Sequence, residues 1–302
     1  MTEPPRAARA SFRAAATPYL YLLPLLLTLG LFTYWPLLDT LWLSLTRWNL
    51  NPGMPVRFEG AANYVRLANS TLFHDAARNT LFYILASIPL KVLLPLPFAV
   101  AIWALGRAGN IYRTILFLPT LISFVAISMV FLWLLNPLGG LLPQAQRALG
   151  LSAANPLADP TSAFWTIMAI SSWKVLGFNV LLYLAGLSRI NPDHVLAMRL
   201  DGASDWQLLR HLLWPMLTPT TFFVLVTTTI FAIQQVFTPI DILTRGGPSN
   251  ATTNLFYMVY QYTFRTFDVG MGAAGTVVIF VLLLGVTLLK FGVLDRRVHY
   301  EQ

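Results

Sequence analysis

The chain has 302 residues, of which 56% are hydrophobic and only 11% are charged, with a formal net charge of +8. Soluble domains have about 25% charged residues, so this composition excludes an ordinary soluble domain and indicates a membrane protein. The chain has no cysteine, which excludes disulfides, Cys-ligated metals and thiol chemistry.

Six runs of the chain are long and apolar enough to cross a hydrocarbon layer of about 30 Å. They carry at most one lysine each and cover residues 17–38, 80–105, 114–135, 162–187, 217–240 and 269–289. We therefore expect an all-α polytopic membrane protein with six transmembrane helices.

The first run follows Arg6, Arg9 and Arg13, as in a secretory signal. It exceeds an h-region of about 7 to 15 residues and no small-residue cleavage site follows it, so we expect an uncleaved helix. With the N-terminus inside, eleven of the 20 Lys and Arg lie on inner segments and seven on outer ones. This bias favours cytoplasmic N- and C-termini. The cations form no continuous patch, which argues against nucleic acid as a partner.

The second run contains three prolines and one lysine, Lys91. Proline frees a helical carbonyl oxygen, and neighbouring helices must compensate because lipid offers no water. We expect Lys91 to bond to carbonyls freed by Pro89, Pro95 and Pro97. A lysine within a span also commonly faces a cavity or a ligand, and that alternative stays open.

Two further groups inside the membrane are candidate solute contacts. In the fourth run, Lys174 lies beside Trp173 and near Asn179, a cluster suited to a phosphate or a sugar hydroxyl. The alternative that Lys174 bonds to freed backbone carbonyls stays open. Gln234 and Gln235 in the fifth run can hold a hydroxylated solute or bond to a neighbouring helix. Tyr257 is a plausible cavity residue too, although aromatic belts are common at this depth.

Residues 191–219 form a polar island between two apolar runs. Asn191 is a favourable N-cap before Pro192, Gly202 supplies a break, and Ser204 with Gln207 has the spacing of a capping box. The island is predicted to contain two short helices with a bend between them.

Several motifs carry no chemistry here. Gly270, Gly272 and Gly275 match a dinucleotide fingerprint, but they open an apolar span and lack a preceding strand, so we interpret them as helix-packing residues. No lysine follows a glycine, so the chain has no P-loop. The four histidines lack metal-ligand spacing, so no metal site is expected. We predict that the chain is not an enzyme.

The island also carries a family resemblance. Asp201, Gly202, Ala203, Trp206 and Pro215 resemble the "EAA" loop with which ABC-importer permeases dock onto a cytoplasmic ATPase. The resemblance departs from the family pattern where Leu196, Ala197 and Met198 stand in place of Glu-Ala-Ala. The coupling residues that it implies are Leu196, Ala197, Asp201, Gly202, Ala203 and Trp206.

Two other segments support the resemblance. Residues 58–80 are similar to the "GxxNY…NT" entry to the core of carbohydrate-type permeases. Residues 244–252 look like the "TxGGPxxxT" segment of the same family.

The resemblance implies the ABC importer permease fold and a division of the chain into five parts. These are a cytoplasmic tail (1–16), a first transmembrane helix (17–46), an extracytoplasmic loop (47–79), a five-helix core (80–293) with its coupling loop (188–216), and a cytoplasmic tail (294–302).

The resemblance also implies a location in the bacterial inner membrane among lipid, and three kinds of protein partner. They are a second, homologous permease, a dimer of ATP-binding subunits and an extracytoplasmic solute-binding protein. No cofactor is expected in this chain, since ATP and Mg²⁺ belong to the ATPase.

Residues 234–264 look most like permeases of the glycerol-3-phosphate and glycerophosphodiester branch. A neutral di- or oligosaccharide stays open as the solute. An ion-coupled carrier would place a carboxylate inside a span, and the predicted spans contain none apart from Asp39 at an end. A lipid-modifying enzyme would need an acid, base or metal cluster, which the sequence lacks.

Overall fold

The computed structural model describes residues 19, 21–50, 53, 55–152 and 154–294. The predicted tail 1–16 and residues 295–302 of the other tail lie outside this range. The all-α prediction is confirmed, because the described elements are helices apart from one short antiparallel ribbon of β1 (Thr46–Arg47) and β2 (Arg57–Phe58).

The helices fall into two halves along the chain. The first half contains η1 (Gly30–Tyr34), α2 (Trp35–Ser44), α3 (Ala62–Ala68), α4 (Thr71–Ser87), η2 (Ile88–Leu93), α5 (Pro95–Ala104), η3 (Gly106–Ala108), α6 (Gly109–Leu121), α7 (Phe124–Leu134) and α8 (Leu141–Ala148). The second half contains α9 (Pro160–Leu187), α10 (Pro192–Leu200), α11 (Asp205–Leu208), η4 (Leu209–Leu213), α12 (Trp214–Met216), α13 (Thr218–Gln235), α14 (Phe237–Pro239), η5 (Ile240–Thr244), α15 (Leu255–Tyr260), η6 (Gln261–Arg265) and α16 (Val269–Leu294).

Five of the six predicted spans are continuous helical stretches in the described residues. They are Tyr21–Ser44, Thr71–Ala104, Pro160–Leu187, Thr218–Thr244 and Val269–Leu288. The second begins ahead of the predicted Thr80, because the Ser70 hydroxyl caps α4 by accepting a hydrogen bond from the Phe73 N–H. Residues 71–79 of the predicted extracytoplasmic loop 47–79 are therefore helical.

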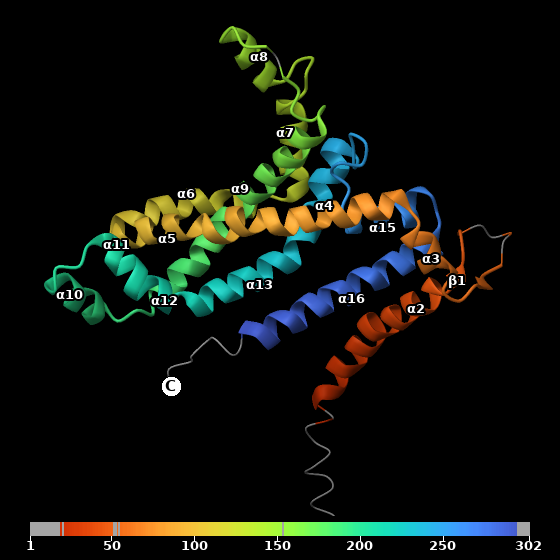
Figure 1. Cartoon of the computed structure of the whole chain (residues 1–302), viewed down its shortest axis with the longest axis horizontal. Helices are drawn as coiled ribbons and strands as arrows, with labels where there is room; N and C mark the ends of the chain where they lie inside the picture. Colours follow the sequence, from red (N-terminus) through yellow and green to blue (C-terminus); the bar gives the residue numbers. More distant parts are fainter. Residues whose placement is uncertain (1–18, 20, 51–52, 54, 153, 295–302) are drawn as a thin grey trace, which may run out of the picture.

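The third predicted span is bent by 90° between α6 and α7. Ile122 and Ser123 are extended there, and the Ser123 hydroxyl caps α7 by accepting from the Ala126 N–H at 3.1 Å. Pro119 lies in the last turn of α6 and removes one helical donor. In Figure 1, α7 consequently turns away from α6 and packs beside α14 and η5, and α8 lies beyond it at the outer end.

The remaining helices form an elongated body. In Figure 1, α10 and α11 lie at one end of the long axis, and β1 and α3 lie at the other end. Three buried apolar clusters hold this body together, centred on Leu187, Ile167 and Met258. The first cluster packs the island against α5 and α9.

A polar clasp fastens the first span to the last. Asn63 is fully buried, and its Nδ2 donates to the carbonyl oxygens of Ser44 and Thr46 at 2.8 Å each. Arg66 Nη1 lies 3.5 Å from Asp268 Oδ2, just before α16. Helix α2 packs along α16 below this clasp.

Candidate functional site

The island folds into the two short helices that its capping residues predict. The Asn191 side chain caps α10 by accepting from the Asp193 N–H at 3.0 Å. Ser204 and Gln207 form the expected capping box at the start of α11. Between the helices, Gly202 has a φ of +80°, a left-handed conformation that side chains with a Cβ adopt reluctantly. The bend is therefore fixed by local chemistry.

An apolar ridge lies on the exposed surface of the island. We define this ridge by Leu196, Leu200 and Trp206, which are 60%, 88% and 66% exposed. Arg199 forms an ion pair with Asp205 and so joins α10 to α11 beside the ridge. An exposed group of large apolar side chains makes this ridge a candidate contact surface for a partner.

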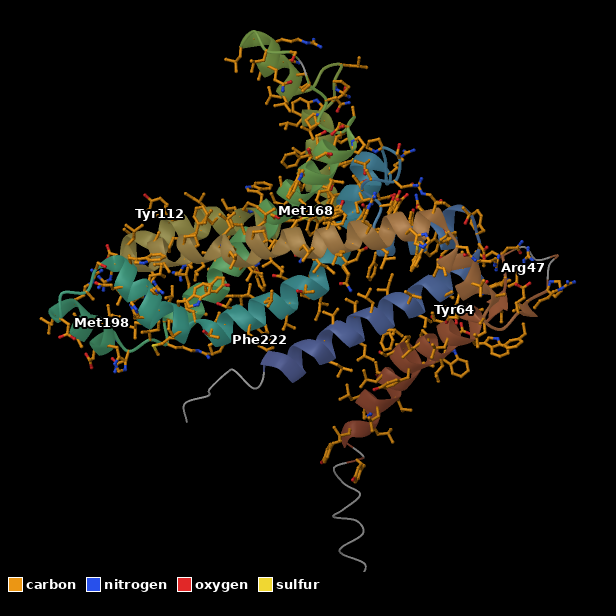
Figure 2. All side chains as sticks on the ribbon, in the orientation of Figure 1. Arg47, Tyr64, Tyr112, Met168, Met198 and Phe222 are labelled. Carbon is orange, nitrogen blue, oxygen red and sulfur yellow. The ribbon has the colours of Figure 1, made fainter. Side chains whose placement is uncertain are left out.

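The opposite face of the island is packed into the protein. Leu208 and Leu213 are buried against α5 and α9, and Met198 packs against the same cluster. Met198, which stands in place of a family alanine, is therefore turned inward from α10. Figure 2 shows Met198 at the end of the molecule opposite Arg47. The inner face of the island is therefore in direct contact with α5 and α9.

Lys174 of α9 is held against the break between α6 and α7. Its Nζ donates to the Thr120 carbonyl oxygen at 3.1 Å, and the Thr120 hydroxyl donates to the Lys174 carbonyl oxygen at 2.9 Å. Its Nζ also lies 4.6 Å from the centre of the Phe124 ring. The neighbouring Trp173 is half exposed and contacts Phe131 edge-on. Lys174 thus joins two helices and lies at the junction of the bent pair.

Asn179 of α9 donates a hydrogen bond to a backbone carbonyl oxygen of the second span. Pro95 has no N–H, so it leaves the carbonyl oxygen of Lys91 without its usual helical donor. Asn179 Nδ2 donates to that oxygen at 2.5 Å, and Tyr183 Oη donates to the next carbonyl, of Val92, at 3.1 Å. The Lys91 Nζ, which we expected to serve these carbonyls, has no hydrogen-bond partner among the described residues.

The other predicted solute contacts lie near the far end of α13. Gln234 is exposed and Gln235 is half-buried. Tyr257 is buried, its ring lies 5.9 Å from that of Phe237, and its hydroxyl donates to Asp241 Oδ1 at 3.1 Å. Burial, followed by the Asp241 carboxylate, raises the pKa of Tyr257 to about 12, so this hydroxyl stays protonated and remains a donor.

Asp241 corrects one detail of the predicted spans. The helical stretch that we expected to end at residue 240 continues to Thr244, so it contains this carboxylate. Arg265 Nη2 donates to Asp241 Oδ1 at 2.9 Å, which compensates its charge. An ion-paired carboxylate is not the free group that an ion-coupled carrier would use.

The loop 244–254 is held by hydrogen bonds from its own threonine hydroxyls and from a side chain of α4. Thr252 Oγ1 donates to the Gly247 carbonyl oxygen at 2.9 Å, and Thr253 Oγ1 donates to that of Gly246 at 3.1 Å. From α4, Asn79 Nδ2 donates to the carbonyl oxygens of Asn250 and Thr253, at 2.9 Å each. The two segments that resemble family motifs, 58–80 and 244–252, are therefore hydrogen-bonded to each other through Asn79 and Asn250.

The predicted solute residues form two groups. Trp173, Lys174 and Asn179 lie along α9, whereas Gln234, Gln235 and Tyr257 lie around the end of α13. Sequence reasoning missed their partners Thr120, Tyr183 and Arg265, because nothing local in the sequence marks a residue as the partner of a distant helix.

Comparison with known proteins gives the same picture over nearly the full chain. Residues 91–300 match the family described as "Binding-protein-dependent transport system inner membrane component". The chain is 32% identical to the sn-glycerol-3-phosphate transport system permease protein UgpA of Pectobacterium atrosepticum, over 97% of this chain and 99% of the relative. It is 30% identical to UgpA of Agrobacterium fabrum, over 94% and 96%.

Solved structures show the same fold. A bacterial ABC transporter that imports the acidic polysaccharide alginate has a chain that superposes with a TM-score of 0.85 at 22% identity, covering 96% of this chain and 99% of that one. The same kind of transporter with an alginate pentasaccharide-bound periplasmic protein gives a TM-score of 0.81. The family match and the full-length relatives together establish that the chain belongs to the inner membrane components of binding-protein-dependent transport systems, as a multi-pass permease subunit of an ABC importer.

Proposed function

We propose that this chain forms half of the translocation pore of an ATP-driven importer for sn-glycerol-3-phosphate or a related glycerophosphodiester. This proposal rests on a sequence identity of at least 30% to glycerol-3-phosphate permeases over nearly the whole of both chains. A net charge of +8 agrees with an anionic solute.

The island is proposed as the site of energy input. A cytoplasmic ATPase would dock on the apolar ridge of Leu196, Leu200 and Trp206, and its closure would push on α5 and α9 through the buried side of the island. This assignment places α10 and α11 in the cytoplasm together with both chain termini. It places β1, β2 and α3 outside the cell.

The complete importer would contain four further subunits. They are a second, homologous permease, two copies of the ATPase, which bind ATP and Mg²⁺, and an extracytoplasmic solute-binding protein. The mechanism is alternating access. Opening and closing of the ATPase dimer, driven by ATP, makes the solute cavity between the two permeases open first to the extracytoplasmic side and then to the cytoplasm. Candidate solute contacts along the pathway are Trp173, Lys174, Asn179, Gln234, Gln235 and Tyr257.

Uptake in cells tests the solute. The chain would be expressed with the ATPase, second permease and binding protein of its own system, in a bacterium that lacks glycerol-3-phosphate importers. We expect ATP-dependent uptake of labelled sn-glycerol-3-phosphate, with competition by unlabelled glycerophosphocholine. Uptake of a neutral disaccharide alone would favour the oligosaccharide alternative and overturn the phosphate assignment.

A further inference from the structure

The ammonium group of Lys91 is buried in the second span and makes no hydrogen bond to any described residue. Its side chain is 1% exposed, and its Nζ has no hydrogen-bond partner among the described residues. A lysine inside a membrane span is costly even when its ammonium group reaches a partner or water. A buried cation without either is a cost that the fold itself does not explain.

The obvious local partners are already occupied. The carbonyl oxygens of Lys91 and Val92 accept hydrogen bonds from Asn179 and Tyr183 of α9. The other lysine within a span offers a contrast, because Lys174 donates to the Thr120 carbonyl oxygen and contacts the Phe124 ring. The helix bundle therefore satisfies one of its two intramembrane lysines and leaves the second unsatisfied.

The segment that carries Lys91 is irregular, and it turns Lys91 and Val92 toward the other helices while Pro89 and Leu93 are exposed. It lies in η2, a π-helical turn that contains Pro89 and ends at Leu93, two residues before Pro95, and such turns occur frequently at functional sites. Helices α4, α5, α9 and α13 all pack against η2. A group from outside reaches the ammonium only when η2 separates from α9 or α13.

We propose that Lys91 is a phosphate-binding residue of the translocation pathway that is shut in this conformation. When helix movement during transport opens the contact between η2 and its neighbours, the Lys91 ammonium donates charge-assisted hydrogen bonds to the phosphate oxygens of the solute. When the solute leaves, η2 closes again. The inference rests on the proposed import of a phosphorylated solute and names the cation that recognises it.

Cysteine accessibility tests whether Lys91 becomes exposed. The chain has no cysteine, so Lys91→Cys introduces a unique thiol. The matched control is Val92→Cys, since Val92 is adjacent, 2% exposed and packed in an apolar cluster. The complete transporter in proteoliposomes would be treated with the small anionic reagent 2-sulfonatoethyl methanethiosulfonate, either free of nucleotide or trapped with ATP and vanadate.

We expect the Lys91→Cys protein to react at least tenfold faster than the Val92→Cys protein in one of the two states, because residue 91 then faces the open pathway whereas residue 92 stays packed. Equal, slow labelling of both variants in both states would show that Lys91 stays buried and would overturn the proposal. This assay reports on Lys91 even if sn-glycerol-3-phosphate is not the solute, so it separates failure of the inference from failure of the proposed function.

Transport kinetics test whether Lys91 binds the phosphate group of the solute. If Lys91 binds the phosphate, Lys91→Met raises the KM for sn-glycerol-3-phosphate by about 10-fold or more, whereas Lys91→Arg retains a KM within about threefold of the unmodified protein. The yield and thermal stability of the Lys91→Met protein should be unchanged or higher, because an unpaired buried charge has been removed. An unchanged KM, or a loss of yield for Lys91→Met, would assign Lys91 a structural role instead.

Discussion

Lys174 and Thr120 bond to each other twice, through the Lys174 Nζ and the Thr120 carbonyl oxygen and through the Thr120 hydroxyl and the Lys174 carbonyl oxygen. The two bonds fasten α9 to the last turn of α6, next to the 90° break that follows it. Lys174 therefore has a structural role at the α6 end of the bent pair, one of the two roles that the sequence left open.

Lys174→Met should lower the free energy of unfolding by roughly 1 to 3 kcal/mol, because it leaves the part-buried carbonyl oxygen of Thr120 without its side-chain donor. Lys91→Met is the matched control, since the same substitution there removes no hydrogen bond. Thermal unfolding in detergent measures both. Equal stability of the two variants would show that the Lys174–Thr120 bonds contribute little.

A solute role for Lys174 remains a separate prediction. Exchange of Lys174 for Gln should weaken apparent affinity for a phosphorylated solute by about 10 to 150-fold if the ammonium also meets the phosphate. Uptake of a neutral sugar would barely change. Vesicle transport assays with the binding protein held constant would compare glycerol phosphate, glycerophosphocholine and a disaccharide, together with the protein yield.

Gly202 should be essential for the bend of the island. Gly202→Pro or Asp201→Arg is expected to abolish uptake while the protein still inserts in the membrane. Gly202→Asn is the control, because asparagine tolerates the left-handed conformation that the φ of +80° requires. Co-purification of the ATPase is the measurement, and normal ATPase binding by the proline variant would refute the docking role.

Leu196 takes the place of a glutamate in the family motif and lies on the exposed ridge. We predict that Leu196→Ala weakens ATPase coupling more than Leu196→Glu does, because glutamate restores the family contact. The second permease of the importer should carry the fuller charged motif. Solute-stimulated ATP hydrolysis ranks the two variants, and the reverse order would show that the ridge is apolar for another reason.

Gly177 of α9 is required for the close approach of α6. A Cβ at this position would lie 2.0 Å from the Leu116 carbonyl oxygen, so Gly177→Ala must push the helices apart at a cost of roughly 1 to 3 kcal/mol. Gly285→Ala in α16 is the control, since a Cβ there meets no described atom within 4 Å. Unfolding midpoints that shift equally in both variants would contradict this packing argument.

The sequence predicted well the features whose chemistry is local. Asn191, Ser204 and Gln207 cap the island helices because their partners lie two or three residues away. The bend between α6 and α7 was hidden, because an uninterrupted apolar run masks the cap at Ser123. The contacts of Asn79 with residues 250 and 253 were beyond prediction, since no local pattern links positions so far apart in the chain.

The packing of α2 along α16 fixes the order in which this protein is completed. Because α2 precedes α16 in the chain, it leaves the ribosome well before its main neighbour and packs against it only after the intervening helices have been synthesised. Arg66 likewise lacks Asp268 until that final segment is inserted. A nonsense mutation late in the gene would therefore leave the N-terminal helix without its partner and expose it to membrane quality-control proteases.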